Sequence, residues 1–162
     1  MRQPTWSRSS AAALISAVVL LGACRAAPTP VRSLDPNADV VVPYAVAGGG
    51  EVRFTVHPRY VIGQPVSVSL DLAAGTLALR GPISGRVAAS GLKGERVVRA
   101  FAPSELGAVE VGPGEKRHLQ FVWDGRDATG AFVAAETYSL SVDFVVGDQL
   151  QRVGSVIEVR AP

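Results

Sequence analysis

Apolar and polar residues alternate along much of the chain after Glu51, and this alternation restricts the possible folds more than any other feature. The apolar positions form five sets: Val52, Phe54 and Val56; Val66, Val68, Leu70 and Leu72; Leu119, Phe121 and Trp123; Tyr138, Leu140, Val142 and Phe144; and Val153, Ile157 and Val159, with Ser155 in phase. Successive side chains of a β-strand point to opposite faces, so each set lies on one face of a strand. A strand with one buried face and one solvent-exposed face is typical of antiparallel sheets.

Glycine and proline clusters separate these runs and mark the turns. They lie at Gly63–Pro65, Gly81–Pro82, Gly91–Gly94, Gly112–Gly114 and Gly125–Gly130. Short strands at regular spacing with such turns predict an all-β sandwich or barrel. A domain of about 110 residues can bury a sufficient core without a disulfide or a metal.

The N-terminal residues 1–23 have the pattern of an export signal. Arg2 and Arg8 precede an apolar run, Ala11–Ala23, that only Ser16 interrupts. A bilayer span needs about 20 apolar residues, and a buried amphipathic helix would have a polar face. A basic start, a short apolar core and small residues at its end therefore predict a secretory signal peptide.

Cys24 is the single cysteine of the chain and follows this run directly. An unpaired cysteine in an exported protein requires an explanation. Leu21-Gly22-Ala23-Cys24 resembles the bacterial lipobox, which implies cleavage before Cys24 and attachment of a lipid to its thiol. Two or three acyl chains would anchor the protein firmly to a membrane of the cell envelope, facing the periplasm or the exterior. The alternative is an ordinary cleavable signal that leaves a free thiol.

Residues 24–50 are predicted to be a tether between the lipid and the domain. Four prolines in this segment disfavour regular structure, and Gly48–Gly50 suggests a hinge. A flexible coil of this length spans roughly 25–30 Å. Val40–Val46 is an additional candidate strand, and Pro43 would restrict it to a sheet edge.

Charge argues against nucleic-acid binding. The formal net charge is +2, and Arg2 and Arg8 of the leader supply both excess charges. The remaining chain is formally neutral and has no long basic run, whereas nucleic-acid binding requires a concentrated cationic surface.

A motif near the end of the chain resembles two known kinds of domain. The segment Phe121–Gly130 reads F-V-W-D-G-R-D-A-T-G. Val133, Thr137 and Tyr138 follow it and belong to the same pattern. It is similar to a pattern in the BsuPI-type intracellular proteinase inhibitor family and in the immunoglobulin-like domain of flagellar hook-capping proteins. The motif residues are Trp123, Asp124, Gly125, Arg126, Asp127, Gly130 and Tyr138. The likeness to the inhibitor family spans about residues 60–145.

This resemblance implies an immunoglobulin-like antiparallel β-sandwich over residues 51–162, preceded by the signal peptide and the flexible linker. Inhibition of a proteinase is the activity that the family would suggest. The chain departs from the family pattern at Glu136 and Ala134, where the family has glycine and proline, and at Ala88–Ser90 in the central hairpins. These departures affect the functional inference more than the fold, because one fold hosts many activities.

The motif contains the candidate site residues. Asp124 and Asp127 are possible calcium ligands, but two carboxylates are few, and aspartates that cap a turn explain the pattern without a metal. We therefore expect no metal and no cofactor. Trp123 and Tyr138 are expected to be core anchors. His57 and His118 are expected on the surface.

No catalytic motif was found in the sequence, and the prediction is a protein that is not an enzyme. The first hypothesis is a binding or structural module, anchored to the membrane through Cys24, with an envelope protein as partner. Its surface would be the loops Pro82–Arg86, Gly91–Gly94 and Asp124–Gly130. The second hypothesis is a proteinase inhibitor with its exposed loop at Ala100–Leu106. An enzyme with scattered polar residues is the third.

Overall fold

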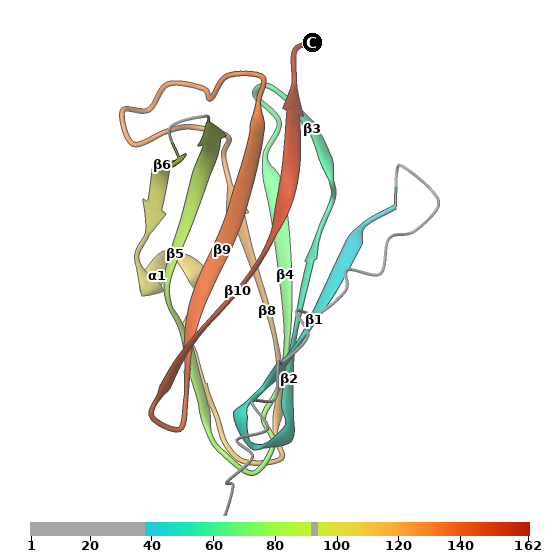
Figure 1. Cartoon of the computed structure of the whole chain (residues 1–162), viewed down its shortest axis with the longest axis vertical. Coiled ribbons are helices and arrows are strands. Elements are labelled where there is room, and N and C mark those ends of the chain that lie inside the picture. Colours follow the sequence, from blue (N-terminus) through green and yellow to red (C-terminus); the bar gives the residue numbers. More distant parts are fainter. Residues whose placement is uncertain (1–37, 92–93) are drawn as a thin grey trace, which may run out of the picture.

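Two β-sheets pack face to face in the computed structural model, which describes residues 38–91 and 94–162 (Figure 1). The four-stranded sheet has the order β1 (Val40–Val46), β2 (Gly50–Val56), β4 (Val66–Ala73) and β8 (Lys116–Trp123). The six-stranded sheet has the order β3 (Arg59–Val61), β10 (Gln149–Arg160), β9 (Thr137–Val146), β5 (Leu79–Gly91) and β6 (Gly94–Phe101), and β7 (Val109–Val111) also pairs with β5. A 3-10 turn, η1 (Ala47–Gly49), and a short helix, α1 (Pro103–Leu106), complete it.

The strand order confirms the predicted immunoglobulin-like sandwich. The chain leaves the four-stranded sheet after β2 and joins the six-stranded sheet as β3. There β3 runs parallel to β10, whereas the other strand pairs are antiparallel. The chain crosses again between β4 and β5, and from β8 to β9, so each sheet is built from distant parts of the sequence.

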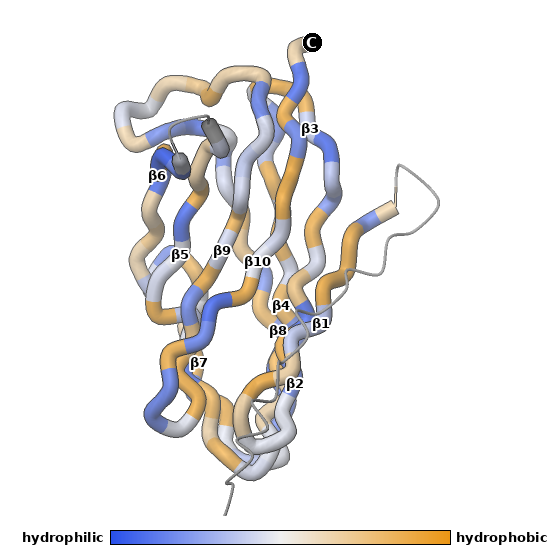
Figure 2. The backbone as a smooth tube through the Cα atoms, in the orientation of Figure 1, coloured by the Kyte–Doolittle hydropathy of each residue, from blue (hydrophilic) through white to orange (hydrophobic). Residues whose placement is uncertain are grey.

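The alternating apolar sets form the core, as predicted. Along β4 the even-numbered positions 66–72 are buried, while Ser67 and Asp71 are exposed. The hydropathy colours of Figure 2 show the same interleaving of apolar and polar residues along the strands. The largest fully buried side chains are Trp123, Tyr138, Phe54 and Phe144. The inner faces of both sheets supply this core. The alternation therefore predicted correctly which side of these strands is buried.

Strand β5 differs from the prediction. Gly81–Pro82 was predicted to be a turn and Pro82–Arg86 an exposed loop, and both predictions are wrong, because these residues lie inside β5. Gly81 and Pro82 are buried, and the pairing of β5 with β9 shifts between Arg80 and Ser84, which accommodates the proline. Val87, Ala88 and Ala89 are buried one after another. A strand covered on both faces has no alternation from which it could be recognised.

The sandwich begins at Val40, earlier than the predicted boundary at Glu51. Strand β1 pairs with β2 along its whole length and lies at the edge of its sheet, where Pro43 is tolerated. The glycines of the predicted hinge form a tight turn instead. The Thr76 N–H donates to the Gly48 carbonyl at 2.8 Å, and a Cβ on Gly50 would lie 2.6 Å from the Ala73 carbonyl oxygen. Close backbone packing therefore requires glycine here.

Tyr44 joins the two sheets at their open side. Its hydroxyl donates to the Gly154 carbonyl and accepts the Gly154 N–H at 3.2 Å, although Tyr44 belongs to β1 and Gly154 to β10. The β10 edge is not covered by β3 at this level, because β3 pairs only with Glu158–Arg160. The tyrosine therefore satisfies backbone groups that an edge strand would otherwise leave to solvent.

Candidate functional site

The motif residues meet in one corner of the sandwich, where β8 passes into β9. Trp123 and Tyr138 are each 1 % exposed, and their rings pack edge to face with centroids 6.0 Å apart. The Trp123 indole N–H donates to the Arg126 carbonyl at 2.7 Å, and the Tyr138 hydroxyl donates to the Ala134 carbonyl at 3.0 Å. Both residues are core anchors, as predicted. A tyrosine bonded to backbone shortly upstream is typical of immunoglobulin-like sandwiches.

The two aspartates of the motif organise their own loop. Asp124 accepts the Arg126 N–H at 3.1 Å. One carboxylate oxygen of Asp127 accepts three hydrogen bonds, from the hydroxyl and N–H of Thr129 and from the N–H of Ala131. The bond from the Thr129 hydroxyl, followed by the backbone bonds, holds the pKa of Asp127 below its ordinary value. Among residues 38–91 and 94–162 no cluster of three or more metal-ligating side chains occurs. The hydrogen bonds of Asp124 and Asp127 to their own loop support the interpretation of the motif as a turn.

The same loop presents an aromatic ring and a cation to solvent. The Arg126 guanidinium lies over the Phe132 ring, 3.8 Å from its centroid, and donates to the Gly130 carbonyl at 2.6 Å. The Ala128 N–H donates to the Val98 carbonyl at 2.9 Å, which ties the loop to β6. Phe132 is 46 % exposed. A large exposed side chain is thus held in one place by its own loop.

Two other predicted loops lie at the ends of β6. Ala100–Leu106, predicted as an exposed loop, contains the end of β6 and the helix α1, and Leu106 is fully buried. The predicted exposure is confirmed for Ala102–Glu105, but the segment is not a loop, and its apolar end Leu106 belongs to the core. Gly91 and Gly94 end β5 and begin β6, as expected for a hairpin, and the two residues between them are outside the described ranges. Cys24 and the predicted signal peptide are outside them too. In the described residues, no helix is long and apolar enough to span a membrane.

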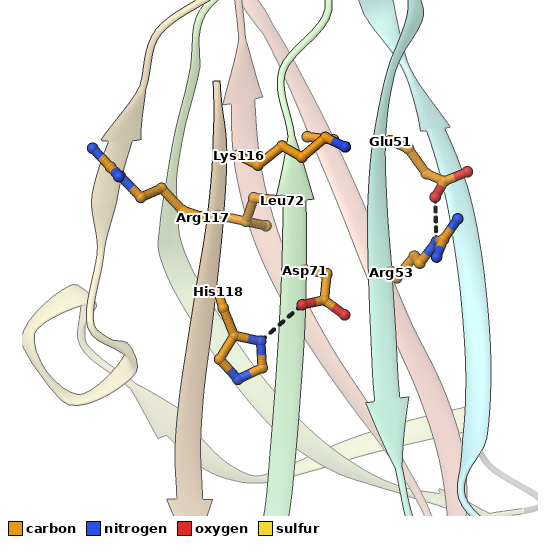
Figure 3. A pocket seen from close by; sticks show the side chains of 8 residues that line it. Glu51, Arg53, Asp71, Leu72, Lys116, Arg117 and His118 are labelled. Carbon is orange, nitrogen blue, oxygen red and sulfur yellow. Dashed lines mark hydrogen bonds and ion pairs between the residues drawn. The ribbon is translucent and has the colours of Figure 1, made fainter. Parts of the chain in front are cut away.

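A group of charged side chains on the outer face of the four-stranded sheet surrounds a shallow depression of about 370 Å³ (Figure 3). We call this depression the charged hollow. Its lining residues come from β2, β4 and β8 and are Glu51, Arg53, Asp71, Leu72, Ala73, Lys116, Arg117 and His118. Ala73 lies between Glu51 and Lys116 in the strand register. Its short side chain leaves the space that the longer neighbours surround.

The polar groups of the charged hollow are only partly paired with one another. His118 Nδ1 lies 2.7 Å from Asp71 Oδ1, and Arg53 is bonded to Glu51. Figure 3 shows Lys116 reaching from β8 across β4 toward Glu51. Lys116 has no hydrogen-bond or ion-pair partner within the described ranges. His118 is on the surface, as predicted, but the grouping of these residues could not be predicted, because their proximity follows from strand register alone.

A second charged group lies on the outer face of the six-stranded sheet and is paired internally. Asp143 accepts two hydrogen bonds from Arg152, at 2.7 and 3.0 Å, and one from the Ser84 hydroxyl at 2.8 Å. It is the one buried charged residue of the described chain. The Arg152 hydrogen bonds lower the pKa of Asp143 more than burial raises it, and the Ser84 bond and the Arg86 charge lower it further. These contacts join β5, β9 and β10, so their function is structural.

Comparison with known proteins adds only distant structural likenesses. No protein-family model matches the chain, and no curated protein matches it. An alkylpurine DNA glycosylase AlkC of Pseudomonas fluorescens aligns over 64 % of this chain and 28 % of its own, with 18 % identity and a TM-score of 0.44. The sporulation control protein Spo0M of Bacillus subtilis aligns over 68 % and 49 %, with 16 % identity and a TM-score of 0.43.

A β-glucosidase of Listeria innocua aligns over 68 % of this chain and 16 % of its own, with 8 % identity and a TM-score of 0.43. The chain thus spans less than half the length of each of these proteins. At such identities and TM-scores these likenesses carry no argument about function. The class defined by the fold is an immunoglobulin-like β-sandwich domain, and its function has to be argued from its own surfaces.

Proposed function

We propose that the protein is a lipid-anchored extracytoplasmic binding module that is not an enzyme. The anchor is the thioether lipid on Cys24, and the segment between Cys24 and β1 holds the sandwich away from the membrane. The partner is a protein of the cell envelope. The charged hollow carries the binding part of this proposal, because side chains from three adjacent strands project there into solvent.

The placement of the charged hollow supports recognition. Strands hold side chains more rigidly than loops, so a site on a sheet face is preorganised for binding. The polar groups of the Asp124–Gly130 loop, in contrast, are largely used in bonds within that loop. For these reasons the proposal assigns the partner surface to the sheet face in preference to the Asp124–Gly130 loop.

Replacing Cys24 by serine is expected to abolish membrane attachment, because serine cannot form the thioether. In the native host, the wild-type chain should partition into the detergent phase of a Triton X-114 extraction, and mass spectrometry should find a diacylglyceryl adduct on Cys24. C24S should lack the adduct and retain its leader, while the control S33A in the tether should behave as wild type. A wild type without lipid, or a C24S chain processed like wild type, would show that the anchor is wrong.

The inhibitor alternative is supported by one observation, the exposed Phe132 held over Arg126 by its loop. A rigid exposed side chain is a feature that binding hot spots share. If this loop inhibits, the purified chain slows a serine protease at near-stoichiometric ratio and stays intact. F132A should then raise the inhibition constant about thirtyfold, while V122A on β8 leaves it unchanged. If no protease of a broad panel is slowed, the inhibitor alternative is rejected.

A further inference from the structure

We propose that the partner of the charged hollow is the same surface on a second copy of this chain. The two four-stranded sheets would pack face to face around a two-fold axis that lies between them and runs across the strands. This inference rests on the proposed function in that it names the partner of that binding surface. It does not depend on the lipid, so the two can fail separately.

The strand register arranges the charges in two adjacent rows. In the first row Glu51, Ala73 and Lys116 lie side by side on β2, β4 and β8. In the second row Arg53 and Asp71 lie side by side, followed by His118. Residues two apart on a strand are separated by about 6.7 Å along it, so the rows are close neighbours. Strand β2 thus has an acidic residue in the first row and a basic one in the second, and β4 has an alanine in the first row and an acidic residue in the second.

A two-fold axis between the rows makes this pattern complementary to itself. The rotation keeps each strand above its own copy and exchanges the rows, so Glu51 faces the partner's Arg53, and Arg53 faces the partner's Glu51. The partner's Asp71 faces the gap above Ala73, beside Lys116. On β8 Lys116, which has no ion-pair partner in the described residues, faces the partner's His118 and lies one strand away from the partner's Asp71 carboxylate. Because the interface is isologous, every such contact occurs twice.

The opposite face of the sandwich is less suited to this role. There Asp143 is paired with Arg152 and Glu95 with Arg86 at 3.1 Å, whereas in the charged hollow, beside the pairs Glu51–Arg53 and Asp71–His118, Lys116 has no partner in the described residues. Charged groups that are already satisfied supply little complementarity to a partner. The unpaired Lys116 and the depression at Ala73 therefore single out the four-stranded sheet.

The size of the face indicates a weak dimer. Four strands spaced about 4.8 Å apart and about eight residues long offer roughly 500 Å² per copy, at the lower end of specific interfaces. Such an interface is typical of transient association. Copies held on one membrane would meet at high effective concentration, which favours pairing without additional contacts. We expect a dissociation constant of roughly 10–100 μM for the chain in solution.

Charge reversal of Asp71 and Lys116 tests the geometry. The full-length chain in density-matched detergent micelles is followed by sedimentation equilibrium from about 5 to 500 μM, so that the range spans the expected dissociation constant. The wild type should show a monomer–dimer equilibrium. D71K and K116D should each raise the dissociation constant at least about tenfold, because each places like charges on neighbouring strands across the interface. The double variant D71K/K116D should recover most of the wild-type affinity, since the two-fold axis regenerates the pair with reversed sign.

The control is R80E, which reverses one charge of the exposed pair Arg80–Glu110 on the other sheet and should leave association unchanged. Circular dichroism of each variant verifies that it is folded. A wild type that stays monomeric up to the highest concentration overturns the dimer. The dimer is also overturned if neither D71K nor K116D changes the dissociation constant. The same holds if the double variant dissociates as readily as the single variants. If K116D instead abolishes crosslinking to a different envelope protein, the second copy is the wrong partner while the binding module stands.

Discussion

Replacing Trp123 by alanine is expected to lower the free energy of unfolding by about 3–5 kcal/mol. The indole is 1 % exposed, packs against Tyr138 and donates to the Arg126 carbonyl. Alanine would leave a cavity at the junction of β8 and β9 and would remove the hydrogen bond that closes the motif loop. Both effects act at the same corner, so the loss should exceed that of an ordinary core truncation in this domain.

Urea unfolding followed by circular dichroism measures this effect. The control is V122A, the neighbouring residue on β8, which is 56 % exposed and points away from the core. Its cost should stay below about 1 kcal/mol. A W123A variant as stable as V122A would mean that the motif tryptophan is not the anchor of this corner.

Replacing Asp143 by asparagine is expected to destabilise the protein by about 1–2 kcal/mol at pH 7. The Asp143 carboxylate is 13 % exposed and accepts two hydrogen bonds from Arg152, and asparagine removes the charge that these bonds require. The Arg152 side chain is 47 % exposed, so solvent screening keeps the loss below that of a fully buried pair.

The pH dependence distinguishes this ion pair from simple packing. The folded protein holds the pKa of Asp143 below its ordinary value of 3.8, so the carboxylate stabilises the fold at every pH above that value. This stabilisation is lost as the pH falls through the lower folded-state pKa. The difference in unfolding free energy between wild type and D143N should therefore be constant from pH 5 to pH 7 and decrease as the pH falls toward 2.

Chemical denaturation at several pH values gives that difference directly. D148N, in the exposed turn between β9 and β10, is the matched control and should match wild type throughout. A D143N deficit that stays unchanged down to pH 2 would contradict the role of the charge and indicate a packing defect.

Most of the strands could be predicted because their apolar residues alternate. Burial of one face is a local property of each strand, so the sets that contain Val66 and Tyr138 identified their inner faces before any neighbour was known. The same reasoning failed for β5, where both faces are covered and Ala88 is as buried as Val87. It also failed for α1, whose four residues are too few for a helical period.

Within the Phe121–Gly130 motif, contacts between residues close in sequence could be predicted, whereas contacts between distant strands could not. Asp127 and Thr129 are two residues apart, so their hydrogen bonds could be anticipated as a turn. The contact between Trp123 and Tyr138 follows from the same short connection. The charged hollow could not be anticipated in this way, because Asp71 and His118 are 47 residues apart and belong to strands that are not consecutive.

The sequence by itself determined the class of fold, the inward side of most strands, the anchors of the motif corner and the expectation of a lipid on Cys24. Only the tertiary structure decided that β1 belongs to the sandwich, that Pro82 lies within a central strand, and that four charged residues and His118 share one sheet face. The physical reason is that periodicity records the environment of each strand separately. Strand order and register depend on packing between distant segments, and these relations place Glu51, Asp71 and Lys116 together.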